Sequence, residues 1–248
     1  MTANAGPEPV TDPDILGDVV SRDRRAPSPA LRADAPGRSY SYHDFVTTSY
    51  KAGNVLRYLG VRGGDRVEIE PDPLPEPVLT FYGAAQLGAV VSFDPGGSER
   101  PRATVVPQSR EPAFAPEPGS KLAVYGGPPE NPTTTHWEKE VWSENPAVHP
   151  ASVSPSDALL DADRTYTHAD VLSAAAGAVG AADIEPGDDV VVRASLSDPG
   201  VVAAGVVAPL LVGATIRFPD DDTVGDVRVG GDGPERRRID PRTVFDGE

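Results

Sequence analysis

Apolar residues recur along this chain with two spacings, one typical of α-helices and one typical of β-strands. Helices are predicted over residues 41–59, 78–87, 171–182 and 199–211. Short apolar or alternating runs predict strands at 66–70, 89–93, 122–125, 158–160, 189–193 and 214–218, and a β-hairpin at 30–41. Because helices and strands alternate in order, the pattern predicts an α/β fold with parallel sheets.

The pattern of the first half recurs in the second half. Ser41–Asp44 and Thr167–Asp170 are capping boxes of the same form, and each opens a helix that leads through a turn to a strand. The chain therefore holds two copies of one α/β unit, at roughly 38–95 and 164–219. Two copies predict two similar parallel-sheet α/β subdomains, built either as two pseudo-symmetric sheets or as one continuous sheet.

The repeat divides the chain into four parts. We expect a disordered tail and a short helix at 1–25, a first α/β subdomain at 26–145, a second at 146–220, and a loose acidic tail at 221–248 with at most one short strand at 226–229. The stretch 94–120 is rich in Pro, Gly, Ser and Arg, which predicts a long loop around a minor strand. A short helix is expected at 133–142, with Trp137, Val141 and Trp142 packed inward.

The charge of the chain is strongly negative. The formal net charge is -16, from 38 acidic and 22 basic residues, and the lysines are Lys51, Lys121 and Lys139 alone. This composition predicts a halophilic, acidic protein, because carboxylates hold hydration in concentrated salt while the salt screens their repulsion. An ordinary acidic protein with a disordered tail is the alternative. Either surface argues against nucleic acid as a partner, since nothing basic is available to displace phosphate counterions.

Several other classes of site are excluded by the residues present. The chain has no cysteine, so it has no disulfide and no thiolate metal site, and its four histidines lack metal-ligand spacing. The N-terminus has no apolar signal core, and the longest apolar run, 201–212, is too short to cross a bilayer. We therefore expect a soluble, cytoplasmic protein with no metal site and no membrane partner.

Five segments stand in an order that matches one known family. They are Tyr40–Phe45, 52–67 with its ending Gly-Gly-Asp-Arg-Val, Phe81–Val91, Tyr166–His168, and Pro209-Leu-Leu-Val-Gly-Ala-Thr215. Together they resemble the N-terminal part of the adenylate-forming (AMP-binding) superfamily, which includes the acyl-CoA synthetases. The resemblance covers roughly residues 26–220, and it accounts for the repeat because the first two subdomains of that family are similar α/β units.

The chain departs from the family at its phosphate loop. Family members use ATP to convert a carboxylate into an acyl-adenylate, and their loop holds the phosphates with hydroxyls, backbone N–H groups and a lysine. The matching stretch, Leu159–Thr165, has no glycine and no lysine and contains Asp161 and Asp163. Because carboxylates repel a triphosphate unless Mg²⁺ bridges them, the resemblance implies a degenerate loop on a retained strand–turn–helix scaffold.

Four residues are candidates for nucleotide binding at this loop. Arg164, Thr165 and Thr167 remain to contact phosphate, and His168 matches a family residue near the acyl pocket. The alternative for His168 is a partly exposed residue of the helix cap. Asp161 and Asp163 are expected to form a surface turn rather than a metal site, and no catalytic residue is assigned.

The family's later motifs lie beyond the matched part of the chain. We therefore expect a truncated, degenerate acyl-CoA synthetase-like paralogue, not catalytic by itself, that acts in binding or regulation with ATP, AMP or CoA as candidate ligands. One subunit of a split acyl-CoA synthetase, forming acyl-adenylates from ATP and a carboxylic acid, is the first alternative. A protein with the fold but no ligand is the second. The partner to expect is a full-length or complementary acyl-CoA synthetase chain.

Overall fold

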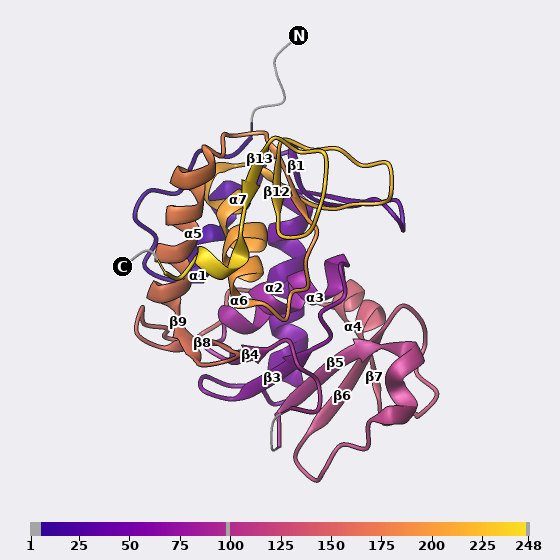
Figure 1. Ribbon diagram of the computed structural model, residues 1–248. Helices are drawn as coiled ribbons and strands as arrows, with labels where there is room; N and C mark the ends of the chain where they lie inside the picture. Colours follow the sequence, from indigo (N-terminus) through magenta and orange to yellow (C-terminus); the bar gives the residue numbers. More distant parts are fainter. Residues whose placement is uncertain (1–5, 98–99, 247–248) are drawn as a thin grey trace.

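The computed structural model describes residues 6–97 and 100–246, and the strands form two sheets (Figure 1). The six-stranded sheet has the order β13 (Arg237–Ile239), β12 (Val227–Val229), β10 (Asp189–Val192), β11 (Thr215–Phe218), β1 (Pro29–Ala33), β2 (Arg38–Ser41). The seven-stranded sheet has the order β7 (Thr135–His136), β6 (Lys121–Tyr125), β5 (Ala103–Pro107), β3 (Arg66–Ile69), β4 (Val90–Ser92), β8 (Ala158–Asp161), β9 (Thr165–Thr167). Neighbouring strands are parallel except in the hairpins β1–β2 and β8–β9.

The two sheets confirm the predicted pseudo-symmetry. The order β2-β1-β11-β10-β12-β13 in one sheet corresponds to β9-β8-β4-β3-β5-β6 in the other. Each opening hairpin pairs with the last strand of the other repeat, β1 with β11 and β8 with β4. Each sheet therefore contains strands from both sides of residue 145, because the two repeats exchange their hairpins.

The long helices begin where the capping boxes predict. α2 (Tyr42–Tyr58) and α5 (His168–Ala182) start after Ser41 and Thr167, whose hydroxyls each accept the backbone N–H three residues later at 3.1 Å. Between these helices in the chain lies α3 (Pro75–Ala85), in which every residue is buried. A helix that is buried on all sides belongs in a core, so α3 lies in the interior of the protein and not at its surface.

The second buried helix runs through three segments, α6 (Pro199–Val201), the π-helical η3 (Val202–Val207) and α7 (Ala208–Val212). Pro209 lacks the N–H that an α-helix would direct to the carbonyl of Gly205, so the helix widens before it. The Ala208 N–H bonds to the Ala203 carbonyl, and the Tyr82 hydroxyl of α3 donates to the Val206 carbonyl at 3.1 Å. The π-helix thus has a local cause and links the two buried helices.

Shorter elements complete the chain. They are α1 (Leu16–Val19), η1 (Arg22–Arg24), η2 (Gln108–Ala113), α4 (Trp137–Ser143) and η4 (Pro241–Thr243). Within the described ranges no helix is both long enough and apolar enough to span a membrane.

Three sequence expectations differ from the structure. The minor strand expected within 94–120 is β5, which lies inside the seven-stranded sheet between β3 and β6. The acidic tail expected to be loose contributes β12, β13 and η4, because Val227 and Val229 alternate with Arg228 and pair in parallel with β10. Trp142, expected to pack inward, is 86% exposed. Residues 1–5 of the expected disordered tail lie outside the described residues, whereas the Val10 N–H bonds to the Leu211 carbonyl at 2.8 Å.

Two glycines allow α2 and α3 to approach closely. A Cβ atom added to Gly83 would lie 2.5 Å from the backbone nitrogen of Gly53, and one added to Gly53 would lie 2.9 Å from the carbonyl oxygen of Gly83. Neither backbone atom can move aside without shifting a helix, so a side chain at either position must separate the pair.

We expect Gly83→Ala to lower the free energy of unfolding by about 1–3 kcal/mol through this overpacking. The matched control is Gly180→Ala on the exposed side of α5, where a Cβ meets nothing within 4 Å, and helix propensity favours Ala there by up to about 1 kcal/mol. Chemical denaturation followed by circular dichroism measures both. Equal stability of Gly83→Ala and the native chain would contradict the close helix contact.

Candidate functional site

The acidic turn lies at the tip of the β8–β9 hairpin. Asp161 of β8 is opposite Thr165 of β9, and the Ala162 N–H bonds to the Arg164 carbonyl at 3.0 Å across the turn. The expected strand–turn–helix geometry is therefore wrong, because Thr165–Thr167 form a second strand before α5 begins. Three strand residues span about 10 Å, which places the N–H groups of the helix start away from the tip.

The polar groups of the tip satisfy one another. The Asp161 carboxylate forms an ion pair with Arg66 of β3 and accepts a hydrogen bond from the Thr165 hydroxyl at 3.0 Å. The Asp163 carboxylate accepts the Tyr166 hydroxyl at 2.9 Å. Burial and then this hydrogen bond raise the pKa of Tyr166 above its usual value, so the phenol stays protonated as the donor.

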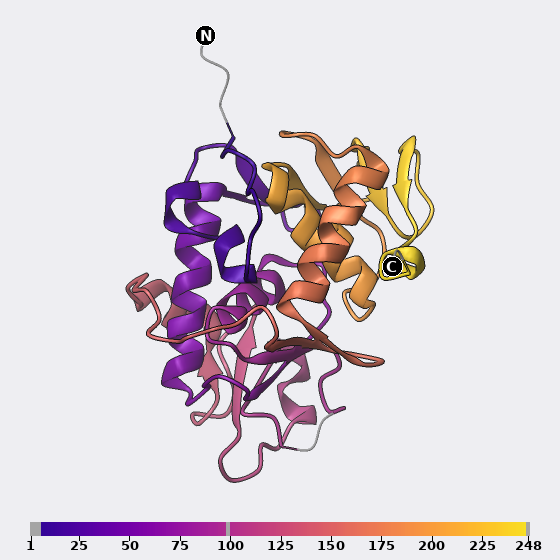
Figure 2. The ribbon, with the colours of Figure 1, turned by 90° about the vertical axis from the view of Figure 1, so that its left-hand side faces the viewer.

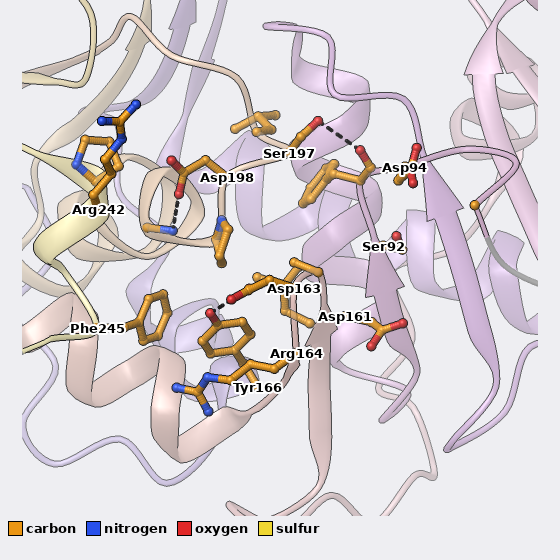
Figure 3. A pocket seen from close by; sticks show the side chains of 18 of the residues that line it. Ser92, Asp94, Asp161, Asp163, Arg164, Tyr166, Ser197, Asp198, Arg242 and Phe245 are labelled. Atoms are coloured by element: carbon orange, nitrogen blue, oxygen red, sulfur yellow. Dashed lines mark hydrogen bonds between the residues drawn. The ribbon is translucent and has the colours of Figure 1, made fainter.

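Arg164 lies on an aromatic pair. Its guanidinium carbon is 4.1 Å from the centre of the Tyr166 ring and 6.0 Å from that of Phe245, and the two rings are 4.4 Å apart. Stacking of this kind holds an arginine in place without an ionic partner. The contact also ties the C-terminal segment to the hairpin tip (Figure 3).

These side chains border a cleft of about 760 Å³, here called the inter-sheet cleft. Its walls come from the end of β4 with Asp94, the β8–β9 tip, the loop after β10 with Asp198, and the C-terminal segment with Arg242 and Phe245 (Figure 3). The cleft therefore opens at the carboxyl ends of strands from both sheets. Ligands of parallel α/β proteins commonly bind at this position.

The charge of the inter-sheet cleft is negative. Five aspartates line it, whereas Arg164 and Arg242 are the arginines that do so; the aspartates are Asp94, Asp161, Asp163, Asp198 and Asp246. Asp161 is neutralised by Arg66, and Asp198 accepts the Gly200 N–H at 2.9 Å as a helix cap. Across the part of the chain that the structure describes, no group of His, Asp or Glu side chains is arranged to hold a metal ion. A polyanion bound in the cleft would lie against these carboxylates, at a Coulombic cost.

Thr167 and His168 lie away from this cleft. The Thr167 hydroxyl and N–H both bond to Asp170 in the helix cap. His168, expected to be partly exposed, is fully buried, and its Nδ1 accepts the Leu16 N–H at 3.1 Å. Its Nε2 has no partner among the described residues. Burial lowers the pKa of His168 to about 4, so this ring is neutral and fixes α1 against the start of α5.

Of the four predicted site residues, only Arg164 lines the cleft. Thr165 is at the tip, but its hydroxyl is taken by Asp161. Sequence analysis missed Asp94, Asp198, Arg242 and Phe245. Asp198 carried a signal, because an Asp-Pro pair that follows a strand and opens a helix marks a cleft edge. Arg242 and Phe245 carried none, since they stand in a stretch that lacked periodicity.

His149 is a second buried histidine whose pKa is lowered, as that of His168 is. His149 is 7% exposed and stacks on Tyr50, with ring centres 5.7 Å apart. Burial, and then the nearby Arg57 and Arg22 cations, lower its pKa to about 4. Each histidine has an unperturbed pKa of 6.5. Between pH 6.5 and about 4 both rings are therefore protonated in the unfolded chain and neutral in the folded chain.

We therefore expect both neutral rings to make their full contribution to the free energy of unfolding above pH 6.5, and this contribution to fall progressively toward pH 4. Between pH 7.5 and 5.0 the free energy of unfolding should fall by about 2 kcal/mol for each ring. His168→Gln keeps an acceptor for the Leu16 N–H and should remove its share of this fall, while exposed His43→Gln should leave it unchanged. Denaturant titrations at the two pH values measure it; the same fall in His168→Gln as in the native chain would refute the assignment.

The fold is that of known ligases. The structure resembles an anthranilate–CoA ligase in complex with anthranoyl-AMP with a TM-score of 0.76 and 19% identity, over 87% of this chain and 49% of that one. It resembles the N-terminal domain of FACL13 from Mycobacterium tuberculosis with a TM-score of 0.72 and 16% identity, over 88% and 63%. For MatB from Rhodopseudomonas palustris the TM-score is 0.72 and the identity 16%, over 86% and 48%.

The sequence comparisons cover less of the chain. No family model matches it. Acetyl-coenzyme A synthetases of Xylella fastidiosa and Deinococcus radiodurans are 36% and 38% identical to it over 64 residues, which are 26% of this chain and 10% of each synthetase. A crotonobetaine/carnitine–CoA ligase of Salmonella typhi is 35% identical over 54 residues. The chain thus spans about half the length of the two full ligases and about a tenth of the curated relatives. It has the α/β fold of the N-terminal part of the adenylate-forming acyl-CoA synthetases and resembles them in sequence over about a quarter of its length.

Proposed function

We propose that this chain is an acyl-CoA synthetase-like binding protein that does not form acyl-adenylates by itself. The observation that carries the proposal is the β8–β9 tip, where the hydroxyls of Thr165 and Tyr166 donate to the carboxylates of Asp161 and Asp163. Catalysis of adenylate formation requires cations and donors around a pyrophosphate leaving group. The tip instead offers carboxylates at this position.

The inter-sheet cleft supports a ligand with fewer negative charges than ATP. Arg164 and Arg242 provide two cations, and Tyr166 and Phe245 provide an aromatic wall whose rings are inclined at 42° to each other. This combination suits a ring with one anionic group, so AMP is the ligand that we propose, rather than ATP or CoA, each of which carries three phosphates. Each further phosphate would approach the aspartates at a Coulombic cost.

A second candidate, one subunit of a split acyl-CoA synthetase, is supported by the position of the cleft. It opens at the carboxyl ends of strands from both sheets, where a second polypeptide could supply the missing cations. A full-length or complementary synthetase chain is the partner that this candidate requires. Exchange activity that appears only when such a chain is added would favour it over the first proposal.

The direct test is ATP–pyrophosphate exchange by the purified chain in high salt, across a panel of carboxylic acids. We expect no exchange above the background without enzyme. The matched variant is Asp161→Asn with Asp163→Asn, which removes two carboxylates from the tip at nearly constant shape. This variant should also be inactive, because the two amides carry no positive charge with which to hold pyrophosphate.

Thermal denaturation with AMP and CoA separates binding from a fold without a ligand. We expect AMP to raise the melting temperature in the native chain and to raise it less in Arg242→Gln. Clear exchange by the chain alone would overturn the non-catalytic proposal, and no shift with AMP would overturn the binding proposal.

A further inference from the structure

The three lysines of the chain lie on one face of the molecule. Lys51 is on α2, Lys121 begins β6 and Lys139 is on α4, which packs against α2 (Figure 2). Lys51 donates a hydrogen bond to the Trp142 carbonyl at 3.3 Å. Lys121 and Lys139 line one groove of about 610 Å³ together with Tyr58. We call the surface of Lys51, Tyr58, Lys121, Lys139 and Trp142 the lysine face.

The same face collects exposed apolar side chains. Among the described residues four large hydrophobic side chains are exposed, and three of them are Trp142 at 86%, Tyr58 at 80% and Val148 at 63%. The segment of Val148 is held along α2, because the Asn54 amide donates to the Asn145 carbonyl at 2.9 Å and to the Ala147 carbonyl at 3.4 Å. A cluster of this kind on a polar surface marks an interaction site.

Trp142 and Lys139 are presented together by α4. They are three residues apart, so they lie on the same side of the helix, while Trp137 and Val141 turn inward. The Trp137 indole is fixed by a hydrogen bond to the Thr80 hydroxyl at 3.0 Å. The buried tryptophan thus anchors a short helix whose outer side carries an exposed tryptophan beside a cation.

Among the described residues many arginines have an ionic partner, whereas the lysines have none. Arginines at nine sites on the two sheets and their loops pair with carboxylates, namely Arg32, Arg38, Arg66, Arg100, Arg102, Arg110, Arg193, Arg217 and Arg237. None of the three lysines does so within 6–97 and 100–246. Glu140 is the carboxylate that lines the groove, against Lys121 and Lys139. In a chain of net charge -16, this face is a local site of unpaired positive charge.

We propose that the lysine face docks an acidic polypeptide other than this chain. A hydrophobic side chain of the partner would cover Trp142, and its carboxylates would lie against the three lysines. Tryptophan and tyrosine are enriched in interface hot spots, and the opposite charge of the partner supplies orientation and association rate. The lysine face shares no lining residue with the inter-sheet cleft, so this inference is independent of the proposed function.

A displayed random peptide library is the probe that tests this inference. The library is selected on the intact native chain and depleted on Trp142→Ala, at the lowest salt at which circular dichroism shows both proteins folded. We expect selected peptides to be rich in Asp and Glu around one aromatic or aliphatic residue. Their dissociation constants should rise at least tenfold on Trp142→Ala and on Lys139→Glu, and should rise with added salt.

The matched controls lie on a distant surface. Val224→Ala removes the fourth exposed hydrophobic side chain, and Arg236→Glu reverses an exposed charge, so both should change the dissociation constants less than twofold. A selection that yields no peptide dependent on Trp142, or that yields neutral or basic peptides, overturns the proposal. Self-association of the native chain that Trp142→Ala abolishes also overturns it, because the face would then join two copies.

Discussion

The exchange of hairpins between the two repeats is the constraint on which the rest of the structure depends. β1–β2 pairs with β11 and β8–β9 pairs with β4, so neither sheet is complete without the other repeat. The Tyr42 hydroxyl at the start of α2 donates to the Ala214 carbonyl beside β11 at 2.7 Å. Arg38 of β2 forms an ion pair with buried Glu76 of α3 at 2.5 Å. The two sheets are therefore joined through their edges as well as through the buried helices.

This exchange also creates the inter-sheet cleft. The β8–β9 hairpin places its tip beside the ends of β4 and β10, which belong to different sheets. At the tip, Asp161 is bound to Arg66 of β3, which lies beyond β4 in the same sheet, so the acidic turn is integrated into the sheet. A turn held in this way cannot redirect its hydroxyl and carboxylates toward a triphosphate without losing those contacts. The electrostatics of the cleft thus follow from how the hairpin is fixed.

Much of this architecture could be predicted from the sequence. The capping boxes at Ser41 and Thr167 and the repeated order of helices and strands identified both α/β units, because caps and periodicity are local signals. The pairing of β1 with β11 could not be predicted, since the choice between partner strands depends on contacts far apart in the chain. The strand expected at 226–229 is β12, whereas β13 was missed because three-residue strands gain their stability from neighbours rather than from propensity.

The candidate site was predicted less well, for a related reason. Arg164 lines the cleft because it stands in the turn itself, whereas His168 and Thr167 were assigned by their nearness in sequence. In the structure β9 separates them from the tip, and burial by α1 removes His168 from solvent. Trp142 was assigned to the core because an amphipathic pattern of seven residues does not specify which of two tryptophans faces inward.

The central claim is that the inter-sheet cleft disfavours a polyphosphate. Titration calorimetry of the native chain with AMP, ADP and ATP, at one fixed salt concentration and without Mg²⁺, tests it most directly. We expect affinity to fall with each added phosphate, because each phosphate brings more negative charge to the aspartates of the cleft. Affinity that rises from AMP to ATP would contradict a cleft that disfavours polyphosphates.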